Sequence, residues 1–130
     1  GSEYAFAQKI PYASIMNQRG ELVEPTAESI SAAASGVIPA DTRTSITNAD
    51  AAGAYPIATF TWMIIYKEQN YSDRSKEQAT ATLNLLQYIL SDEAQNITSE
   101  VHYAPLPAKA KELSMKNLKT VTYDGMPILQ

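Results

Sequence analysis

Few side chains of this 130-residue chain have the chemistry that catalysis or metal binding requires, and they are scattered. His102 is the only histidine and there is no cysteine, so a Ser–His pair or a metal site would depend on a single imidazole. The carboxylates show no metal-ligand spacing. We therefore expect neither a metal nor a cofactor. For His102 we expect a structural role, with its imidazole hydrogen-bonded in the corner before Pro105.

Two pairs of carboxylates lie close in the sequence, Glu21 with Glu24 and Asp92 with Glu93. General acid–base catalysis needs an environment that drives two pKa values apart, and the sequence gives no sign of one. Both pairs also stand where solvated or helix-capping carboxylates are common. We expect no catalytic role for them and predict that the protein is not an enzyme.

Two sets of side chains have the chemistry of an anion site. An arginine can clamp an oxyanion with two parallel hydrogen bonds, and hydroxyls at helix starts can join backbone amides in an anion cradle. Solvated arginines and ordinary helix caps account for the same residues, so both interpretations stay open. The arginines are Arg19, Arg43 and Arg74, and the hydroxyls at predicted helix starts are those of Thr26, Ser72 and Ser75.

An aromatic group lies along one apolar stretch: Tyr55, Phe60, Trp62 and Tyr66. Such a row could be a stacking platform for sugars or bases. A stretch this apolar is more often part of a hydrophobic core, and we expect the core role here.

The composition describes a globular protein of one domain, with 45% hydrophobic and 18% charged residues. The net charge of −4 and the absence of long basic runs argue against nucleic acid as a partner. The longest apolar run, residues 60–66, is far shorter than the roughly 20 residues that span a bilayer.

Hydrophobic periodicity and turn residues predict an α/β or α+β order of elements. A helix is expected to begin at Pro25, end at Ser35 and be capped by Gly36. The strongest strand signal, at 55–66, predicts a central strand covered on both faces. The other elements expected are a helix end at 3–9, a strand at 12–16, a turn at 17–20, an extension to Pro25, a long loop at 39–54, helices at 75–91, 92–98 and 107–118, a rigid corner at 102–107, and an extended segment at 120–123 before a loose tail.

Four segments in this order resemble the phosphate-binding proteins of ABC importers: EYAFA (3–7), YPI (55–57), the helix at 75–91, and YAPLP (103–107). The resemblance covers nearly the whole chain. It implies the C-terminal part of a two-lobed periplasmic-binding-protein clamp, an α/β fold with a three-layer mixed sheet and flanking helices. Residues 3–54 would end the second lobe, and residues 55–130 would supply the returning hinge strand and the C-terminal helices of the first.

The resemblance implies a receptor that delivers inorganic phosphate to ABC permease subunits, either periplasmic or anchored by lipid outside the cytoplasmic membrane. In that family, hydroxyls, backbone amides, an arginine and an aspartate hold the anion. Part of this set is an Arg-x-x-x-Ser-Gly-Thr-like segment with no counterpart here, so no ligand-binding residue is assigned and we expect this chain to lack the anion site. The alternatives are a receptor for sulfate, molybdate or tungstate, and a non-enzymatic interaction module on the cell surface.

A chain of this kind would also lack partners for its predicted central strand. An exposed edge on an apolar strand invites pairing with another chain. We therefore expect either a strand-exchanged homo-oligomer or association with the missing N-terminal part.

Overall fold

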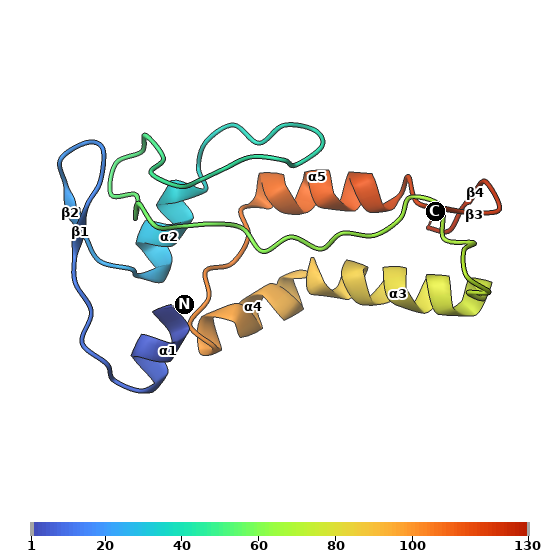
Figure 1. Ribbon diagram of the computed structural model, residues 1–130, viewed down its shortest axis with the longest axis horizontal. Helices are drawn as coiled ribbons and strands as arrows, with labels where there is room; N and C mark the ends of the chain where they lie inside the picture. The colour runs from blue at the N-terminus through green and yellow to red at the C-terminus, as the bar shows by residue number, and fades with distance from the viewer. Residues whose placement is uncertain (1, 130) are drawn as a thin grey trace.

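The computed structural model describes residues 2–129 as a small mixed α/β fold, elongated from one terminal hairpin to the other (Figure 1). Its helices are much longer than its strands, each of which has two residues. The elements are α1 (Ser2–Ala7), β1 (Ile15–Met16), β2 (Leu22–Val23), α2 (Ala27–Ala33), α3 (Lys76–Ile89), α4 (Asp92–Glu100), α5 (Ala108–Leu118), β3 (Thr122–Tyr123) and β4 (Met126–Pro127).

The first hairpin confirms the predicted turn at 17–20. Strands β1 and β2 are antiparallel, with Ile15 opposite Val23. The turn is held by Asn17, whose side-chain oxygen accepts hydrogen bonds from the amides of Arg19 and Glu21 at 3.0 and 3.1 Å. A short polar side chain that bonds its own backbone in this way is a strong local turn signal, which is why sequence alone located it.

Helix α2 is shorter than predicted. Thr26 is its N-cap, and the Thr26 hydroxyl accepts a hydrogen bond from the Ser29 amide. The helix therefore begins after the cap, at Ala27, and not at Pro25. The predicted glycine cap is also wrong, because the helix ends at Ala33 with Ala34 as its C-cap.

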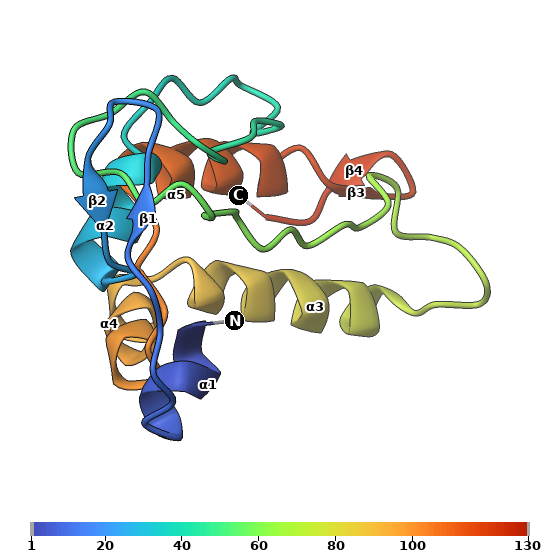
Figure 2. The ribbon, with the colours of Figure 1, turned by 60° about the vertical axis from the view of Figure 1, so that its left-hand side comes forward.

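The prediction of a central, fully covered strand at 55–66 is wrong. These residues run as an extended chain between α5 and α3, outside any sheet (Figures 1 and 2). A single parallel bridge, Glu68 with Thr122, follows just beyond them. A strand exists only where a neighbouring strand completes its hydrogen bonds, and residues 2–129 offer none here. The two small sheets therefore do not form the expected three-layer sheet. The predicted loop at 39–54 is confirmed.

The three C-terminal helices are where the sequence placed them. Ser75 caps α3 through a capping box with Gln78, as the spacing of the two residues predicted. Ser91 caps α4, which extends to Glu100, and Pro107 precedes α5. None of the helices within residues 2–129 has the length and apolar run needed to cross a bilayer.

The C-terminal tail is ordered where a loose tail was expected. Strands β3 and β4 pair antiparallel across Asp124 and Gly125, whose φ angles of 52° and 72° suit a two-residue hairpin turn. The Ile128 amide then donates to the Val121 carbonyl, so the chain stays attached after the hairpin. Residue 130, the last of the predicted first-lobe segment, lies outside the described residues.

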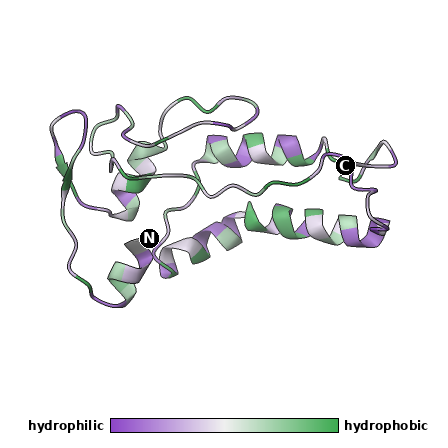
Figure 3. Cartoon of the chain, in the orientation of Figure 1, coloured by the Kyte–Doolittle hydropathy of each residue, from purple (hydrophilic) through white to green (hydrophobic). Residues whose placement is uncertain are grey.

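The hydrophobic core is divided into three clusters, and the extended segment connects them. Ala58 belongs to the first cluster, Phe60 packs against the first and second, and Ile65 packs against the third. Figure 3 shows hydrophobic residues along this segment and in the second half of α3. The buried members are Ala33, Ala34, Ile46, Ala54 and Ala58 in the first cluster, Ile38, Ala110 and Leu113 in the second, and Leu83, Leu118 and Val121 in the third.

Substitution of two leucines on α3 tests the packing of the third cluster. Leu83 is fully buried and Leu85 is 57% exposed. We expect Leu83→Ala to lower the free energy of unfolding by about 2–5 kcal/mol, because it removes buried methyl groups and leaves a cavity. Leu85→Ala is the matched control and should change that free energy by about 0.5 kcal/mol or less. Urea denaturation measures both, and equal losses would contradict the packing described.

Candidate functional site

The hydroxyls considered for an anion cradle do not meet. Thr26 and Ser75 cap helices α2 and α3, and each hydroxyl accepts a backbone amide at 3.2 Å. The start of α2 and the start of α3 lie at opposite ends of the molecule (Figures 1 and 2). Ser72 is not at a helix start, since it occupies a turn with a φ of 50°. Thr26 and Ser75 are therefore helix caps.

Two of the three arginines form exposed ion pairs with nearby aspartates. The Arg43 guanidinium contacts one carboxylate oxygen of Asp41, with Nε and Nη2 each 2.9 Å from Oδ2. Arg19 Nε lies 3.8 Å from Asp50 Oδ1. Exposed pairs of this kind contribute little to stability.

Arg74 is the arginine with the most enclosed surroundings. Its guanidinium lies 5.7 Å from the centre of the Tyr71 ring and donates hydrogen bonds to the Gln78 carbonyl and the Thr82 hydroxyl. Its Nε is buried and has no hydrogen-bond partner among residues 2–129. These neutral acceptors fasten the turn before α3 onto the helix. Within the described part of the chain, no carboxylate lies within ion-pair distance of this charge.

A hollow of about 360 Å³ adjoins Arg74. It lies between the end of the extended segment and α3, and it is lined by Ile64, Ile65, Tyr66, Gln69, Tyr71, Arg74 and Thr82. The Tyr66 and Tyr71 rings form one wall, edge to face, with centres 4.9 Å apart. The lining is mostly apolar and aromatic, with one cation, so this hollow suits an apolar side chain better than a free oxyanion.

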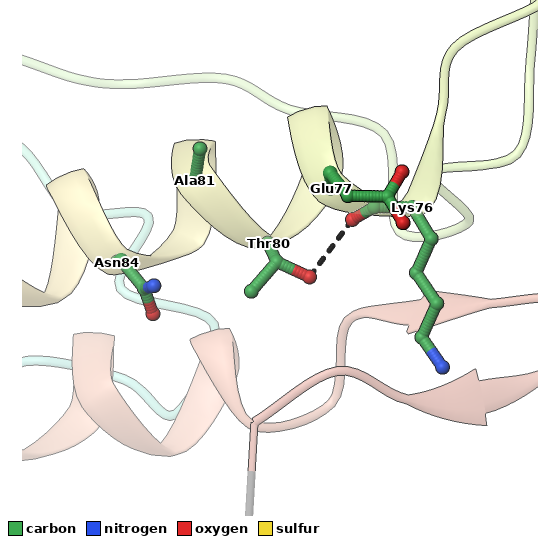
Figure 4. Close-up of a pocket in the computed structure, with 5 residues that line it drawn as sticks. All are labelled: Lys76, Glu77, Thr80, Ala81 and Asn84. Carbon is green, nitrogen blue, oxygen red and sulfur yellow. Dashed lines mark hydrogen bonds between the residues drawn. The ribbon is translucent and has the colours of Figure 1, made fainter.

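A second hollow, of about 400 Å³, lies along one face of α3 (Figure 4). All of its lining residues come from that helix: Lys76, Glu77, Thr80, Ala81 and Asn84. The Thr80 hydroxyl already donates to the Lys76 carbonyl at 2.8 Å. Because a single helix face cannot surround a ligand, this hollow offers no site for a small anion.

His102 is exposed and has a φ of 62°. Its ring packs 5.5 Å from the ring of Phe6, which joins the corner after α4 to α1. The expected imidazole hydrogen bond is not formed with any group in residues 2–129. The contact that His102 makes is aromatic packing on Phe6. The same described residues contain no group of three histidine, cysteine or carboxylate side chains placed to hold a metal ion.

One member of each carboxylate pair has structural contacts. Glu21 accepts hydrogen bonds from the Asn17 side chain and the Gly53 amide, each at 2.8 Å, and these contacts lower its pKa. Asp92 forms an ion pair with Lys111, and that lysine lowers the pKa of Asp92. In both cases the ionised form is stabilised, so neither carboxylate is prepared to carry a proton at neutral pH.

The aromatic row is only partly in the core. Phe60 is half-buried and meets Trp62 edge to face, with ring centres 5.7 Å apart. Trp62 is 44% exposed and Tyr66 is 69% exposed, so the core role expected for both is wrong in this structure.

Glu68 is the polar centre that sequence reasoning missed. Its carboxylate accepts four hydrogen bonds, from the amides of Asn70, Asp124 and Gly125 and from the Thr122 hydroxyl, at 2.8–3.1 Å. These bonds tie the end of the extended segment to the C-terminal hairpin. The one available signal was the Asp-Gly turn, which leaves backbone amides free for an acceptor.

The class of protein follows from three curated relatives, each named a phosphate-binding protein PstS. The relative from Methanocaldococcus jannaschii is 29% identical over 127 residues, which cover 91% of this chain and 33% of the relative. Those from Xylella fastidiosa strains Temecula1 and 9a5c are 34% and 33% identical over 107 residues, which cover 80% of this chain and 28% of each relative. No protein-family model matches the chain.

These relatives are binding proteins for a small anion by name, and this chain is similar to part of them. The resemblance indicated by the sequence motifs is confirmed: the chain is related to the PstS phosphate-binding proteins. It spans about a third of the length of the curated relatives it matches.

The hydrogen bonds to Glu68 predict that the stability of the fold depends on pH. These four hydrogen bonds, led by the one from the Asn70 amide, lower the pKa of Glu68 from 4.5 to about 2. A pKa that is lower in the folded state gives stability that is present above pH 4.5 and is lost as the pH falls towards 2. Glu68→Gln should therefore be less stable than the wild type at pH 7, with the difference shrinking between pH 4.5 and 2 in urea denaturation.

The control for this experiment is Thr122→Ala, which removes one donor and keeps the carboxylate. Carboxyl-carbon NMR titration should find the pKa of Glu68 raised in that variant but still below its ordinary value. A stability difference between wild type and Glu68→Gln that is the same at every pH would contradict the assignment.

Proposed function

We propose that this chain is part of a phosphate receptor of an ABC importer, which delivers inorganic phosphate to membrane permease subunits. The observation that carries the proposal is the similarity to PstS proteins across 80–91% of the chain. In this proposal the protein is a receptor and not an enzyme, and it works outside the cytoplasmic membrane, either free in the periplasm or anchored by lipid.

The proposed architecture is a two-lobed clamp of which this chain is the C-terminal part. Residues 3–54 would complete the second lobe, and residues 55–130 would return to the first lobe. The extended segment at 55–66 supports this division, because it leads from the loop at 39–54 to the helices α3, α4 and α5. Its association would be with the remaining part of a longer chain or with another copy.

The anion site would lie outside this chain. Thr26, Ser75, Arg19 and Arg43 are each occupied by local contacts, which supports assigning no ligand-binding residue here. An oxyanion receptor needs several donors that converge on one point and are free to bind, since an unpaired buried donor is costly. Specificity for phosphate over sulfate, molybdate or tungstate would then be set by residues of the other part.

A calorimetric titration tests the absence of the site. Phosphate added to the purified 130-residue chain should give no saturable heat, and neither should sulfate, because no set of free donors converges. Saturable binding of phosphate by this chain would contradict the claim that the site lies elsewhere.

A chimera tests the function itself. This chain would replace the matching part of the relative from Xylella fastidiosa strain Temecula1, and the unmodified relative would serve as the control. We expect the chimera to bind phosphate saturably and not to bind sulfate. The reason is that, in this proposal, the anion contacts lie in the part of the relative that is kept. A folded chimera that binds no phosphate while the control does would count against the proposal.

A further inference from the structure

The C-terminal hairpin turns at the one Asp-Gly step of the sequence, Asp124 and Gly125. This dipeptide is chemically labile in a flexible chain, because glycine leaves its amide nitrogen unshielded and its backbone free to rotate. The nitrogen can then attack the side-chain carbon Cγ of the preceding aspartate and close a five-membered ring. The turn therefore contains both groups that this backbone modification requires.

The reaction is a dehydration followed by a hydrolysis. The bond from the glycine nitrogen to Cγ forms, the amide proton is lost and the side-chain carboxyl group loses a hydroxyl, so one water leaves and a succinimide remains. Water then adds to one of the two ring carbonyls and opens the ring. Opening at one carbonyl restores aspartate. Opening at the other gives isoaspartate, in which the main chain runs through the former side-chain carbon.

Glu68 holds the attacking nitrogen in the folded chain. The Gly125 amide donates to Glu68 Oε2 at 3.1 Å, and the Asp124 amide donates to Oε1 of the same carboxylate at 3.0 Å. The Thr122 hydroxyl donates to Oε2 at 2.8 Å and so orients the carboxylate. Ring closure requires the nitrogen to leave this oxygen and turn towards Cγ. Hydrogen bonds to an ionised acceptor are stronger than neutral ones, so leaving is costly.

Asn70 holds the other reacting group. Its side-chain Nδ2 donates to Asp124 Oδ1, and its own amide donates to Glu68 Oε1 at 2.9 Å. The backbone of the dipeptide is fixed as well, because strands β3 and β4 pair on either side of it. Nucleophile and electrophile are therefore each bonded to a group outside the dipeptide, which keeps them from meeting.

We propose that Asp124-Gly125 is a site of isoaspartate formation and that Glu68 is the positioning residue that suppresses the reaction in the folded protein. The modification then proceeds only when the hairpin opens locally, and its rate is the rate of the free dipeptide multiplied by the open fraction. The contacts involved all join residues 68–125 of this chain. The inference does not depend on the proposed function.

Incubation at neutral pH followed by peptide mapping measures the reaction. Peptides with aspartate and isoaspartate have the same mass but separate in chromatography, and electron-transfer fragmentation identifies the isoaspartate. The same chain unfolded in guanidinium chloride gives the rate of the free dipeptide. We expect the folded chain to form isoaspartate at position 124 more slowly than the unfolded chain by about tenfold or more, because at least one charge-assisted hydrogen bond must break first.

Glu68→Gln tests the role of the carboxylate. A glutamine has one acceptor oxygen and its amide nitrogen only donates, so this variant loses the charge and part of the four hydrogen bonds. We expect it to form isoaspartate about tenfold faster than the wild type. Thr122→Ala, which keeps the carboxylate and removes one of its donors, should show a smaller increase.

Asn17→Ala is the matched control. It removes the hydrogen bonds that hold the turn of the first hairpin, at the opposite end of the molecule from β3 and β4 (Figure 1). This variant should be less stable than the wild type but should form isoaspartate at position 124 at the wild-type rate. Circular dichroism of each variant verifies that the fold is kept.

Hydrogen exchange separates positioning from a merely structural role. In Glu68→Gln the Asp124 and Gly125 amides should exchange faster than in the wild type. The Ile128 amide, which donates to the Val121 carbonyl at 3.1 Å, should keep its protection, because Glu68 does not contact it. Equal loss of protection at Ile128 would show that Glu68 only holds the hairpin together, and it would overturn the positioning role.

The isomerisation rates themselves have two contrary outcomes. A folded Glu68→Gln that isomerises no faster than the wild type would overturn the protective role, and a slower rate would mean that the carboxylate takes up the amide proton as a base. An unfolded chain that forms no isoaspartate at position 124 would overturn the modification site.

Discussion

The fold depends on one extended segment, residues 55–66, whose side chains pack into the core while most of its backbone groups have no backbone partner among residues 2–129. The inward side chains of residues 55–66 connect three separate hydrophobic clusters, since Ala58 lies in the first, Phe60 packs against the first and second, and Ile65 packs against the third. The backbone of residues 57–66 donates no hydrogen bond to other backbone groups within the described chain. Hydrophobic burial and a few hydrogen bonds near the two ends of the segment, such as those from Thr47 to the Ala58 carbonyl and from Gln69 to the Tyr66 carbonyl, therefore position it. Burial does not fix register in the way a strand ladder does.

Side-chain hydrogen bonds hold together segments that the backbone of a larger sheet would otherwise connect. Buried Gln95 accepts the Leu106 amide at 2.7 Å and donates to the Ile89 carbonyl at 2.8 Å, which fixes the corner before α5. Buried Asn17 donates to the Ala54 carbonyl and so holds the first hairpin on the long loop. Each buried amide has its partners, so losing one would leave an unsatisfied group at a cost of about 1–3 kcal/mol.

Elements specified by local chemistry could be predicted from the sequence. The capping box of Ser75, the turn at Asn17 and the start of α5 after Pro107 each depend on residues within a few positions. The strand at 55–66 could not be predicted correctly, because pairing depends on chain segments far away. The candidate site followed the same division: the caps were recognised as one interpretation, whereas the Glu68 contacts join residues more than fifty positions apart.

The polar residues and residues 60–66 differ in the hydrogen bonds that they already make. Thr26 and Ser75 already have their hydrogen bonds, so recruiting them to an anion would first break contacts that hold a helix start. The ionised Glu68 carboxylate only accepts hydrogen bonds and would repel an anion. Residues 60–66 form no backbone–backbone hydrogen bond among residues 2–129, and Trp62 and Ile64 are 44% and 94% exposed. Capture of a small anion by the hydroxyls of Thr26 and Ser75 is disfavoured, because each hydrogen bond to an anion would replace one that already holds the fold.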